Sequence, residues 1–431
     1  MTTVYESNNT NIFPNLNRLR IFQINKRYTL AILSHFGFTI AIALFTYTHY
    51  KVYISLYPDL KTLVFTLAHF FVQIPAAIYS YKYSATRLFG ICILGVSILT
   101  FVCPILIPRY EPVLLGAADP AFYSIWRYWS PPLERSTLVA LGYTGSFTGT
   151  LIVDKLVKIN LFTVENSLYV YGLVGILWYF EWFWISFDHP RQHPSITEEE
   201  YVYLEQTVTI THTSPLQSIP WKKIFLNIPI STLLVTSFLH TLSGWVTMHF
   251  GENNFVKLIT ILVASFVSDL LLRKSLISTI NLRKIYICGG LAMVIPFWSS
   301  TLVENPNDSI WVNILSPFAM VIYCIPLVGF YANHLEVAAE YSGITKALRN
   351  MVVTLTTILV VTPNEFLDIY TFHKRLFLIL IIFGAIFYAI CGSSEQQDLK
   401  SEQKDLKSEQ QDLLEESRQQ QNLQQSRRKI N

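Results

Sequence analysis

The chain has 431 residues, of which 52% are hydrophobic and only 14% are charged, whereas an ordinary soluble domain carries about 25% charged residues. This composition excludes most soluble enzymes and predicts an integral, multi-pass membrane protein that is surrounded by a lipid bilayer. The formal net charge of +3 is small, and no basic stripe with interleaved aromatic residues occurs. Nucleic acid is therefore not expected as a partner.

Long hydrophobic blocks recur along the chain, and about 20 apolar residues are needed for a helix to cross a bilayer. Eight strong spans are predicted at residues 28–48, 63–81, 88–107, 168–187, 224–246, 285–303, 310–332 and 376–391. Four weaker spans are predicted at residues 113–126, 137–153, 255–272 and 344–361. Together they predict an all-α membrane protein with about twelve transmembrane helices in two six-helix halves.

Two of the weaker spans carry unusual residues. The span at 113–126 contains Asp119 followed by Pro120, which we expect to break the helix because proline removes a helical hydrogen bond. The span at 344–361 begins with Lys346 and Arg349, which we assign to an internal loop. Since Lys and Arg collect in cytoplasmic loops, their distribution predicts that both termini are cytoplasmic.

The largest interruption of the hydrophobic pattern divides the chain. The predicted parts are a cytoplasmic N-terminal tail at 1–27, a six-helix half at 28–187, a central cytoplasmic loop at 188–223, a second six-helix half at 224–392 and a polar heptad-repeat cytoplasmic tail at 393–431. In the central loop, Thr197 before three glutamates is typical of a helix N-cap. In the tail, only one position per heptad is apolar, which favours a solvated tail over a coiled coil. The six-plus-six layout is typical of transporters whose halves rock about a central site, although composition alone also allows a channel.

Several motifs occur in a fixed order along the chain. They are WRYWSPPLERS at 126–136, Gly145-Ser146 with Gly149, Tyr171-Gly172 with Gly175, the Asp188 to Ile196 run, Ser268-Asp269 with its neighbouring leucines, and Gly329-Phe330 with Asn333 and Tyr341. Over residues 25 to 395 the chain resembles the anion transporters of the major facilitator superfamily, which include sialin, the vesicular glutamate transporters and the sodium-phosphate cotransporter relatives.

The resemblance implies a function. It implies secondary active transport of a small organic or inorganic anion, of the sialate, glutamate or phosphate class, by alternating access. Transport would be coupled to protons, sodium or the membrane potential, in the plasma membrane or in a lysosomal or vesicular membrane. The oligomeric state, the anion and the coupling ion stay open.

Departures from the family pattern lead to a second hypothesis. By the same alignment, the first-helix arginine that relatives use for anionic substrates falls on Phe45, and the fourth-helix arginine falls near Pro108 or Arg109. The acid of the helix-two gating motif falls on Tyr81. These losses favour a transport-deficient membrane scaffold or interaction protein that retains the family fold, whereas the retained WSPPLERS loop favours transport.

Polar residues inside spans are functional candidates, because an ionisable side chain at mid-bilayer costs about 2.5 to 3.5 kcal/mol on insertion scales. His240 in the seventh helix is one, since histidine exchanges protons near neutral pH, with a satisfied core histidine as the alternative. Glu181 stands among aromatic residues and could carry a proton or form a structural hydrogen bond. The residues expected to line the substrate or proton path are Tyr47, His69, Gln73, Glu181, His240 and Asn333.

A second set of residues is expected to act as a gate. Arg127, Glu134 and Arg135 are predicted to form cytoplasmic ion pairs that close the N-terminal half. Motifs for other chemistry are missing: the cysteines lack a C-x-x-C spacing, and no phosphate-binding loop, H-E-x-x-H or G-x-S-x-G motif occurs. Neither a metal site, a cofactor nor an enzymatic activity is predicted.

Overall fold

The computed structural model describes residues 25–48, 58–102, 107–158, 164–208, 219–247, 253–295, 309–361 and 366–395. These residues form helices and short connections, and no strand occurs among them. Most of the predicted N-terminal tail and of the heptad-repeat tail lies outside the described residues.

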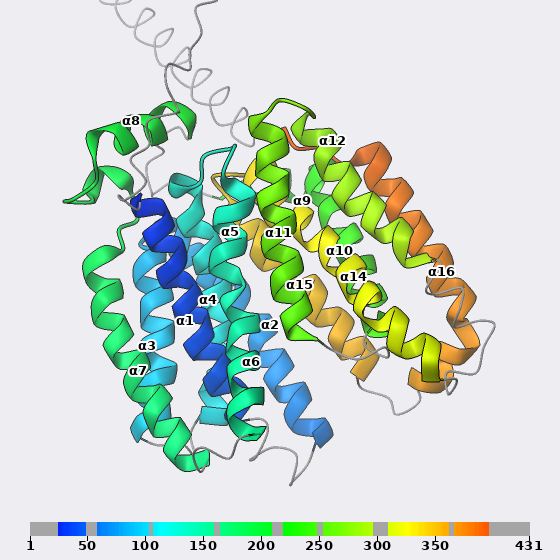
Figure 1. The fold of residues 1–431 in the computed structure, drawn as a ribbon, viewed down its shortest axis with the longest axis horizontal. Helices are drawn as coiled ribbons and strands as arrows, with labels where there is room; N and C mark the ends of the chain where they lie inside the picture. The colour runs from blue at the N-terminus through cyan, green and yellow to red at the C-terminus, as the bar shows by residue number, and fades with distance from the viewer. Residues whose placement is uncertain are drawn as a thin grey trace, which may run out of the picture.

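The first half of the chain forms the first group of helices, which lies on one side of the molecule (Figure 1). It consists of α1 Lys26–Thr48, α2 Pro58–Lys82, α3 Ala85–Val102, α4 Ile107–Trp129, α5 Arg135–Tyr143, α6 Gly145–Lys158 and α7 Val164–Ile185. Thr144, between α5 and α6, keeps a right-handed helical backbone. The two short helices therefore act as one apolar span, from Arg135 to Leu156.

The second group lies on the other side (Figure 1). It consists of α9 Trp221–Leu226, α10 Ile228–Thr247, α11 Asn254–Arg273, α12 Thr279–Lys284, the π-helical turn η6 Ile285–Gly289, α14 Ser309–Val337, α15 Ser342–Val361 and α16 Phe366–Cys391. The helix that starts at α12 continues through η6 to residue 295. The groups meet where α15 packs on α2 and α4, and where α11 and α14 pack on α5.

Between the groups, the chain forms a short 3-10 turn, η4 Pro190–Gln192, and the helix α8 Glu198–Thr207. The predicted N-cap is confirmed, because the Thr197 hydroxyl accepts a hydrogen bond from the Glu200 amide at 3.3 Å. Helix α8 lies beyond one end of the bundle, next to the start of α1 (Figure 1). We call this end of the molecule the α8 end.

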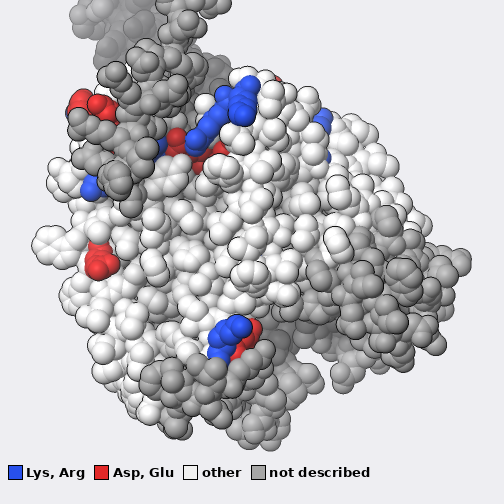
Figure 2. All heavy atoms as spheres, in the orientation of Figure 1, with Lys and Arg blue, Asp and Glu red and all other residues white. Residues whose placement is uncertain are grey.

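The hydrophobic pattern located the helices well. Each of the twelve predicted spans overlaps a helix of the structure. Within the described residues, six helices are long and apolar enough to cross a membrane. Uncharged atoms cover most of the middle of the face in Figure 2, where one acidic group lies at the left edge, and the other charged atoms visible there lie toward the two ends. This surface is typical of a protein with a lipid-covered belt.

The expected break at Asp119 and Pro120 was wrong. Helix α4 runs without interruption through Pro112 and Pro120. Membrane helices tolerate proline because neighbouring groups satisfy the freed backbone atoms, and Pro120 packs against α15, where its carbonyl lies close to Gly343. Asp119 is therefore held on a continuous helix and points toward the second group of helices, as its contacts with α15 show.

Candidate functional site: a buried cationic cluster and contacts at the α8 end

A chain of polar side chains crosses the contact between the two groups of helices. The Lys346 ammonium on α15 lies 3.3 Å from the Asp119 carboxylate on α4. The Asn350 amide, one turn further along α15, donates to Asp119 at 2.6 Å and to Gln73 on α2 at 3.1 Å. Gln73 in turn lies 3.3 Å from the ring of His69. The predicted path residues His69 and Gln73 are thus part of one network that joins both groups.

Aromatic rings surround the ammonium group of Lys346. Its nitrogen lies 4.6 Å from the ring centre of Tyr123, 4.9 Å from that of Tyr143 and 5.8 Å from that of Tyr331. The side chain of Lys346 is fully buried. Rings within about 6 Å attract a cation through their negative faces, so the cage offsets part of the cost of burying this charge.

Arg349 adds a second buried cation on the same helix face, because residues three apart are neighbours on a helix. Its guanidinium donates to the Ser237 hydroxyl on α10 at 3.1 Å and lies 5.4 Å from the ring centre of Phe330. No carboxylate of the described residues forms an ion pair with it. Lys346, Arg349 and Asp119 together therefore carry a net charge of +1.

Several buried polar atoms near these cations have no hydrogen-bond partner among the described residues. They are the Asp119 Oδ1 atom, the Tyr123 hydroxyl, the Lys346 ammonium and both ring nitrogens of His334. His334 is almost fully buried, and its ring packs edge-on against Tyr123. Buried polar groups are normally hydrogen-bonded, so a concentration of unpartnered ones around a cation is typical of a site for a polar ligand.

The structure does not bring all the predicted path residues into this network. His240 on α10 is buried, with its Nε2 3.0 Å from the Tyr323 carbonyl, and its ring centre lies 5.4 Å from that of Phe330, which also packs under Arg349. Asn333 donates to the Tyr388 hydroxyl on α16. Tyr47 lies in the last turn of α1, and its side chain is outside the described part of the structure.

Glu181 lies elsewhere. It is exposed on the outer face of α7, whereas Trp178 and Trp182 of the same helix are buried. Their indole nitrogens donate to the carbonyls of Leu33 and Thr86, which fixes the rotation of α7 and turns Glu181 outward. The expectation that aromatic residues enclose this carboxylate was wrong.

The charge distribution assigned Lys346 and Arg349 to an internal loop, which was wrong, whereas their place at the start of the predicted span 344–361 agrees with the structure. Both lie inside α15 and are buried. Their spacing was a usable signal, because Lys346, Arg349 and Asn350 stand three and four residues apart at the start of an otherwise apolar helix. That spacing places polar groups on one face, although it does not reveal that the face is covered by α2 and α4.

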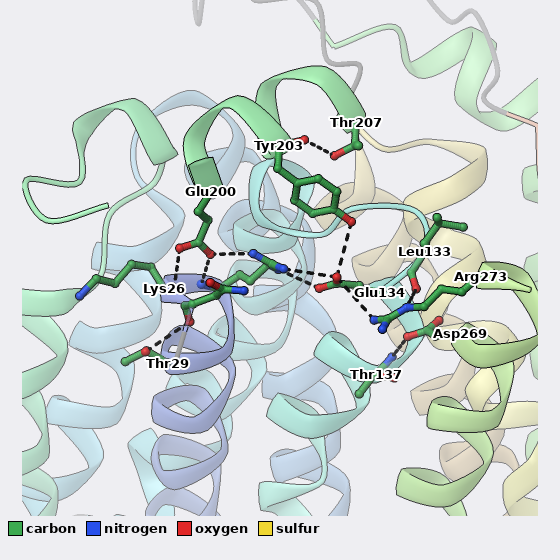
Figure 3. A network of polar contacts seen from close by, with 12 residues as sticks. Lys26, Thr29, Leu133, Glu134, Thr137, Glu200, Tyr203, Thr207, Asp269 and Arg273 are labelled. Atoms are coloured by element: carbon green, nitrogen blue, oxygen red, sulfur yellow. Dashed lines mark hydrogen bonds and ion pairs between the residues drawn. The ribbon is translucent and has the colours of Figure 1, made fainter. Parts of the chain in front are cut away.

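Glu134 is the centre of a second polar network, at the α8 end (Figure 3). Its carboxylate lies 2.8 Å from Arg27 at the start of α1 and 3.5 Å from Arg273 at the end of α11. Arg27 also pairs with Glu200 of α8 at 2.9 Å. Glu200 accepts the backbone N–H of Lys26 at 2.8 Å, which ties α8 to the N-terminus of α1.

Tyr203 of α8 completes this network. Its hydroxyl donates to Glu134 at 3.5 Å, and Figure 3 shows its ring pointing from α8 toward that carboxylate. Burial, with the nearby Glu134 charge, raises the pKa of Tyr203 to about 12. The phenol therefore keeps its proton near neutral pH and acts as a donor.

The predicted gate residues differ in their partners. Glu134 does form ion pairs, but its partners are Arg27 and Arg273. Arg127 lies over the rings of Tyr128 and Tyr81, and Arg135 donates to the Ser130 carbonyl at 3.3 Å. Neither arginine forms an ion pair with a carboxylate of the described residues. Ion pairs within this set of three, which were expected in one conformation of the protein, do not occur among the described residues of this structure.

Contacts between the two groups of helices also occur at the α8 end. The Asp269 carboxylate on α11 accepts the backbone N–H groups of Ser136 and Thr137 at 3.2 and 2.7 Å. Arg283 pairs with Glu336 at 2.6 Å and donates to the Ser136 hydroxyl at 3.1 Å. These contacts place the first turn of α5 against α11 and α12. Among the described residues, no three His, Cys, Asp or Glu side chains come together as a metal site.

No family model matches the chain, but its sequence is similar to those of several known proteins. The chain is 29% identical over 371 residues to vesicular glutamate transporter 1 of Xenopus laevis, and the aligned region covers 75% of this chain and 63% of that protein. It is 26% identical over 438 residues to the probable vesicular glutamate transporter eat-4 of Caenorhabditis elegans, with 88% and 76% covered. The chain spans less than two thirds of the length of several relatives that it matches.

Solved structures show the same fold. A bacterial homologue of the iron transporter ferroportin in an outward-facing state has a TM-score of 0.55 with 11% identity, covering 84% of this chain and 98% of that one. The human organic anion transporter MFSD10 has a TM-score of 0.56 with 11% identity, covering 85% and 100%. The chain thus has the major facilitator fold, and its sequence is similar to those of the vesicular glutamate transporters.

Proposed function

We propose that the protein is a secondary transporter that carries a small organic anion across a membrane by alternating access. One observation carries the proposal: Lys346 and Arg349 are two buried cations one turn apart on α15, and among the described residues only one carboxylate, Asp119, pairs with either of them, through Lys346. An unbalanced buried charge is costly, and an anionic ligand would balance it. The likeness to vesicular glutamate transporters makes glutamate the first substrate to test.

The arrangement supports a rocking mechanism. Lys346, Arg349 and Asn350 come from α15, while Asp119 and Gln73 come from the first group of helices, so motion of one group against the other opens the cluster. Contacts of Asp269 and Arg283 with Ser136 hold the groups together at the α8 end. Release of these contacts would open the cluster toward that end, and closure would follow at the other.

The proposal extends to orientation and coupling. Since Lys and Arg collect on the cytoplasmic side of membrane proteins, the α8 end, with Arg27 and Arg273, would be cytoplasmic. The coupling ion is a proton or sodium, or the membrane potential drives uptake directly. A vesicular membrane agrees with the names of the relatives, and a lysosomal membrane and the plasma membrane are the alternatives.

Uptake into proteoliposomes tests this function. Purified protein is reconstituted, and labelled glutamate, sialate, urate and phosphate are offered under imposed pH, sodium and voltage gradients. Saturable uptake above that of protein-free liposomes is expected for at least one anion. If a folded preparation takes up none of them under any gradient, the carrier assignment is wrong and the scaffold hypothesis replaces it.

A disulfide cross-link between the two groups of helices distinguishes alternating access from conduction through a fixed pore. The hydroxyls of Ser136 and Ser268, from the two groups, lie 3.1 Å apart, so a Ser136→Cys, Ser268→Cys pair can form a disulfide. Oxidation should abolish uptake and reduction should restore it, while the Ser136→Cys single variant should not respond. Full uptake in the oxidised double variant would contradict alternating access.

A further inference from the structure

We propose that a carboxylate of the substrate binds the Lys346 ammonium during transport, at the position that Asp119 occupies in this structure. The substrate and Asp119 then compete for one ammonium group. The inference rests on the proposed transport function and names the residues that bind its substrate. The ligand class is a small organic acid with at least one carboxylate. The observations that carry it are the incomplete coordination of Lys346, the second partner of Asp119 and the surplus of positive charge.

The ammonium of Lys346 can donate to a further hydrogen-bond acceptor. A lysine has three donors, and this one lies 3.3 Å from a single Asp119 oxygen without a well-aligned hydrogen bond. The rings of Tyr123, Tyr143 and Tyr331 also lie near it, and they attract the charge but accept no conventional hydrogen bond from it among the described contacts. A substrate carboxylate would supply the missing acceptors.

Asp119 can leave Lys346 without losing all its partners. Its Oδ2 atom accepts from the Asn350 amide at 2.6 Å, a shorter contact than the one to Lys346, and Asn350 is also held by Gln73. The other oxygen, Oδ1, is buried and has no hydrogen-bond partner in the described part of the chain. An exchange in which Asp119 stays on Asn350 while a second carboxylate binds Lys346 therefore leaves both carboxylates bound.

The charge of the cluster favours that exchange. Arg349 lies one turn from Lys346, and no carboxylate of the described residues pairs with it. A ligand with one negative charge brings the net charge of the three groups from +1 to zero. The unpartnered ring of His334 and the Tyr123 hydroxyl offer further polar contacts to the rest of a small ligand.

Competition would link binding to motion. Asp119 and Lys346 come from different groups of helices, so their ion pair ties the groups together. Lys346 is fully buried, and a substrate reaches it only when the groups separate. A substrate that replaces Asp119 removes the tie that holds the empty cluster closed, which is the differential stabilisation that a transport cycle needs.

Binding measurements on four variants of the full chain test the inference. The probe is tritiated L-glutamate, or labelled sialate if only sialate is taken up, and the protein is purified in nanodiscs. Lys346→Gln should weaken the apparent affinity at least about tenfold, whereas Lys346→Arg, which keeps the charge, should weaken it far less. Asp119→Asn should tighten binding severalfold, because the amide cannot compete for the ammonium as a charged group. The exposed Glu181→Gln is the matched control and should bind like the wild type.

The outcomes separate this inference from the function on which it rests. Uptake by the wild type together with unchanged affinity in Lys346→Gln would overturn the site and leave the transport function intact. Weaker binding in Asp119→Asn, with the variant folded as judged by size-exclusion chromatography, would overturn competition and make Asp119 a direct ligand of the substrate. Absence of uptake and binding in the wild type would overturn both proposals.

Discussion

Arg27 on α1 and Glu134 before α5 form a buried ion pair, with 2.8 Å between the guanidinium Nε and the carboxylate. The same guanidinium reaches Glu200 of α8 at 2.9 Å. One cation therefore connects the first helix, the motif loop after α4 and the helix between the two groups. Few substitutions at the α8 end should disturb the fold as much as the loss of this cation.

Arg27→Gln should lower the apparent unfolding temperature in detergent clearly. It leaves Glu134 and Glu200 buried with fewer cationic partners, and removal of one partner of a buried pair costs about 3 to 5 kcal/mol. Glu134→Gln should be milder, because Glu200 still balances Arg27. Thermal unfolding followed by fluorescence measures both. Arg191→Gln, at an exposed residue, is the control, and equal unfolding temperatures for Arg27→Gln and Arg191→Gln would show that the pair adds no stability.

Gly145→Ala should destabilise the protein, whereas Gly289→Ala should not. A Cβ at Gly145 would overlap the backbone carbonyl of His35 on α1, and backbone cannot move aside as a side chain can. At Gly289 a Cβ would meet no atom of the described residues within 4 Å, and alanine is favoured over glycine in a helix by roughly 0.5 to 1 kcal/mol. The yield of monodisperse protein and its unfolding temperature compare the two. A Gly145→Ala protein as stable as the Gly289→Ala protein would mean that α6 does not pack this closely on α1.

The positions of the helices could be predicted from the sequence, because long apolar blocks have few alternatives to a helix in a bilayer. The continuous α4 could not be predicted, since tolerance of Pro120 depends on the helices packed around it. The outward rotation of Glu181 likewise depends on long-range bonds, from Trp178 and Trp182 to other helices.

The partners of the polar residues were the least predictable part. The motif around Glu134 was visible, but its partner Arg27 lies far away in the sequence. Lys346 and Arg349 stand close to a helix start, where charged residues usually belong to a loop. Only the packing of α15 against α2 and α4 buries Lys346, and packing between distant segments leaves no local pattern in a single sequence.

His240→Ala and Glu181→Gln should differ in uptake, although both residues were predicted from the sequence to line the path. His240 is buried, stacks on Tyr323 and packs against Phe330, the ring beneath Arg349. Its removal should disturb the position of Arg349 and reduce the initial rate of uptake, most strongly at low substrate concentration. Glu181 is exposed, so Glu181→Gln should leave uptake unchanged. Initial rates measured over a range of substrate concentrations and normalised to reconstituted protein test both. Equal losses in the two variants would restore Glu181 as a path residue.

Asp269→Asn should open the α8 end. The Asp269 carboxylate accepts two backbone N–H groups in the first turn of α5, where a helix N-terminus stabilises a negative charge by about 0.3 to 1 kcal/mol when exposed and up to about 2 kcal/mol when partly buried. The amide side chain keeps the size but loses the charge. An interaction of this strength changes a two-state population by roughly 2- to 30-fold, so a mainly closed protein would gain a measurable open fraction.

Distances between spin labels measure that fraction. Tyr83 and Leu276 are exposed near the α8 end, in the connection between α2 and α3 and after α11, respectively, so Tyr83→Cys and Leu276→Cys in a cysteine-free background carry one label on each group of helices. Asp269→Asn should add a population at longer distance, and Glu181→Gln in the same background should not. An unchanged distance distribution in Asp269→Asn would mean that closure at this end depends on Arg283 and its contacts with Ser136 and Glu336 rather than on the charge of Asp269.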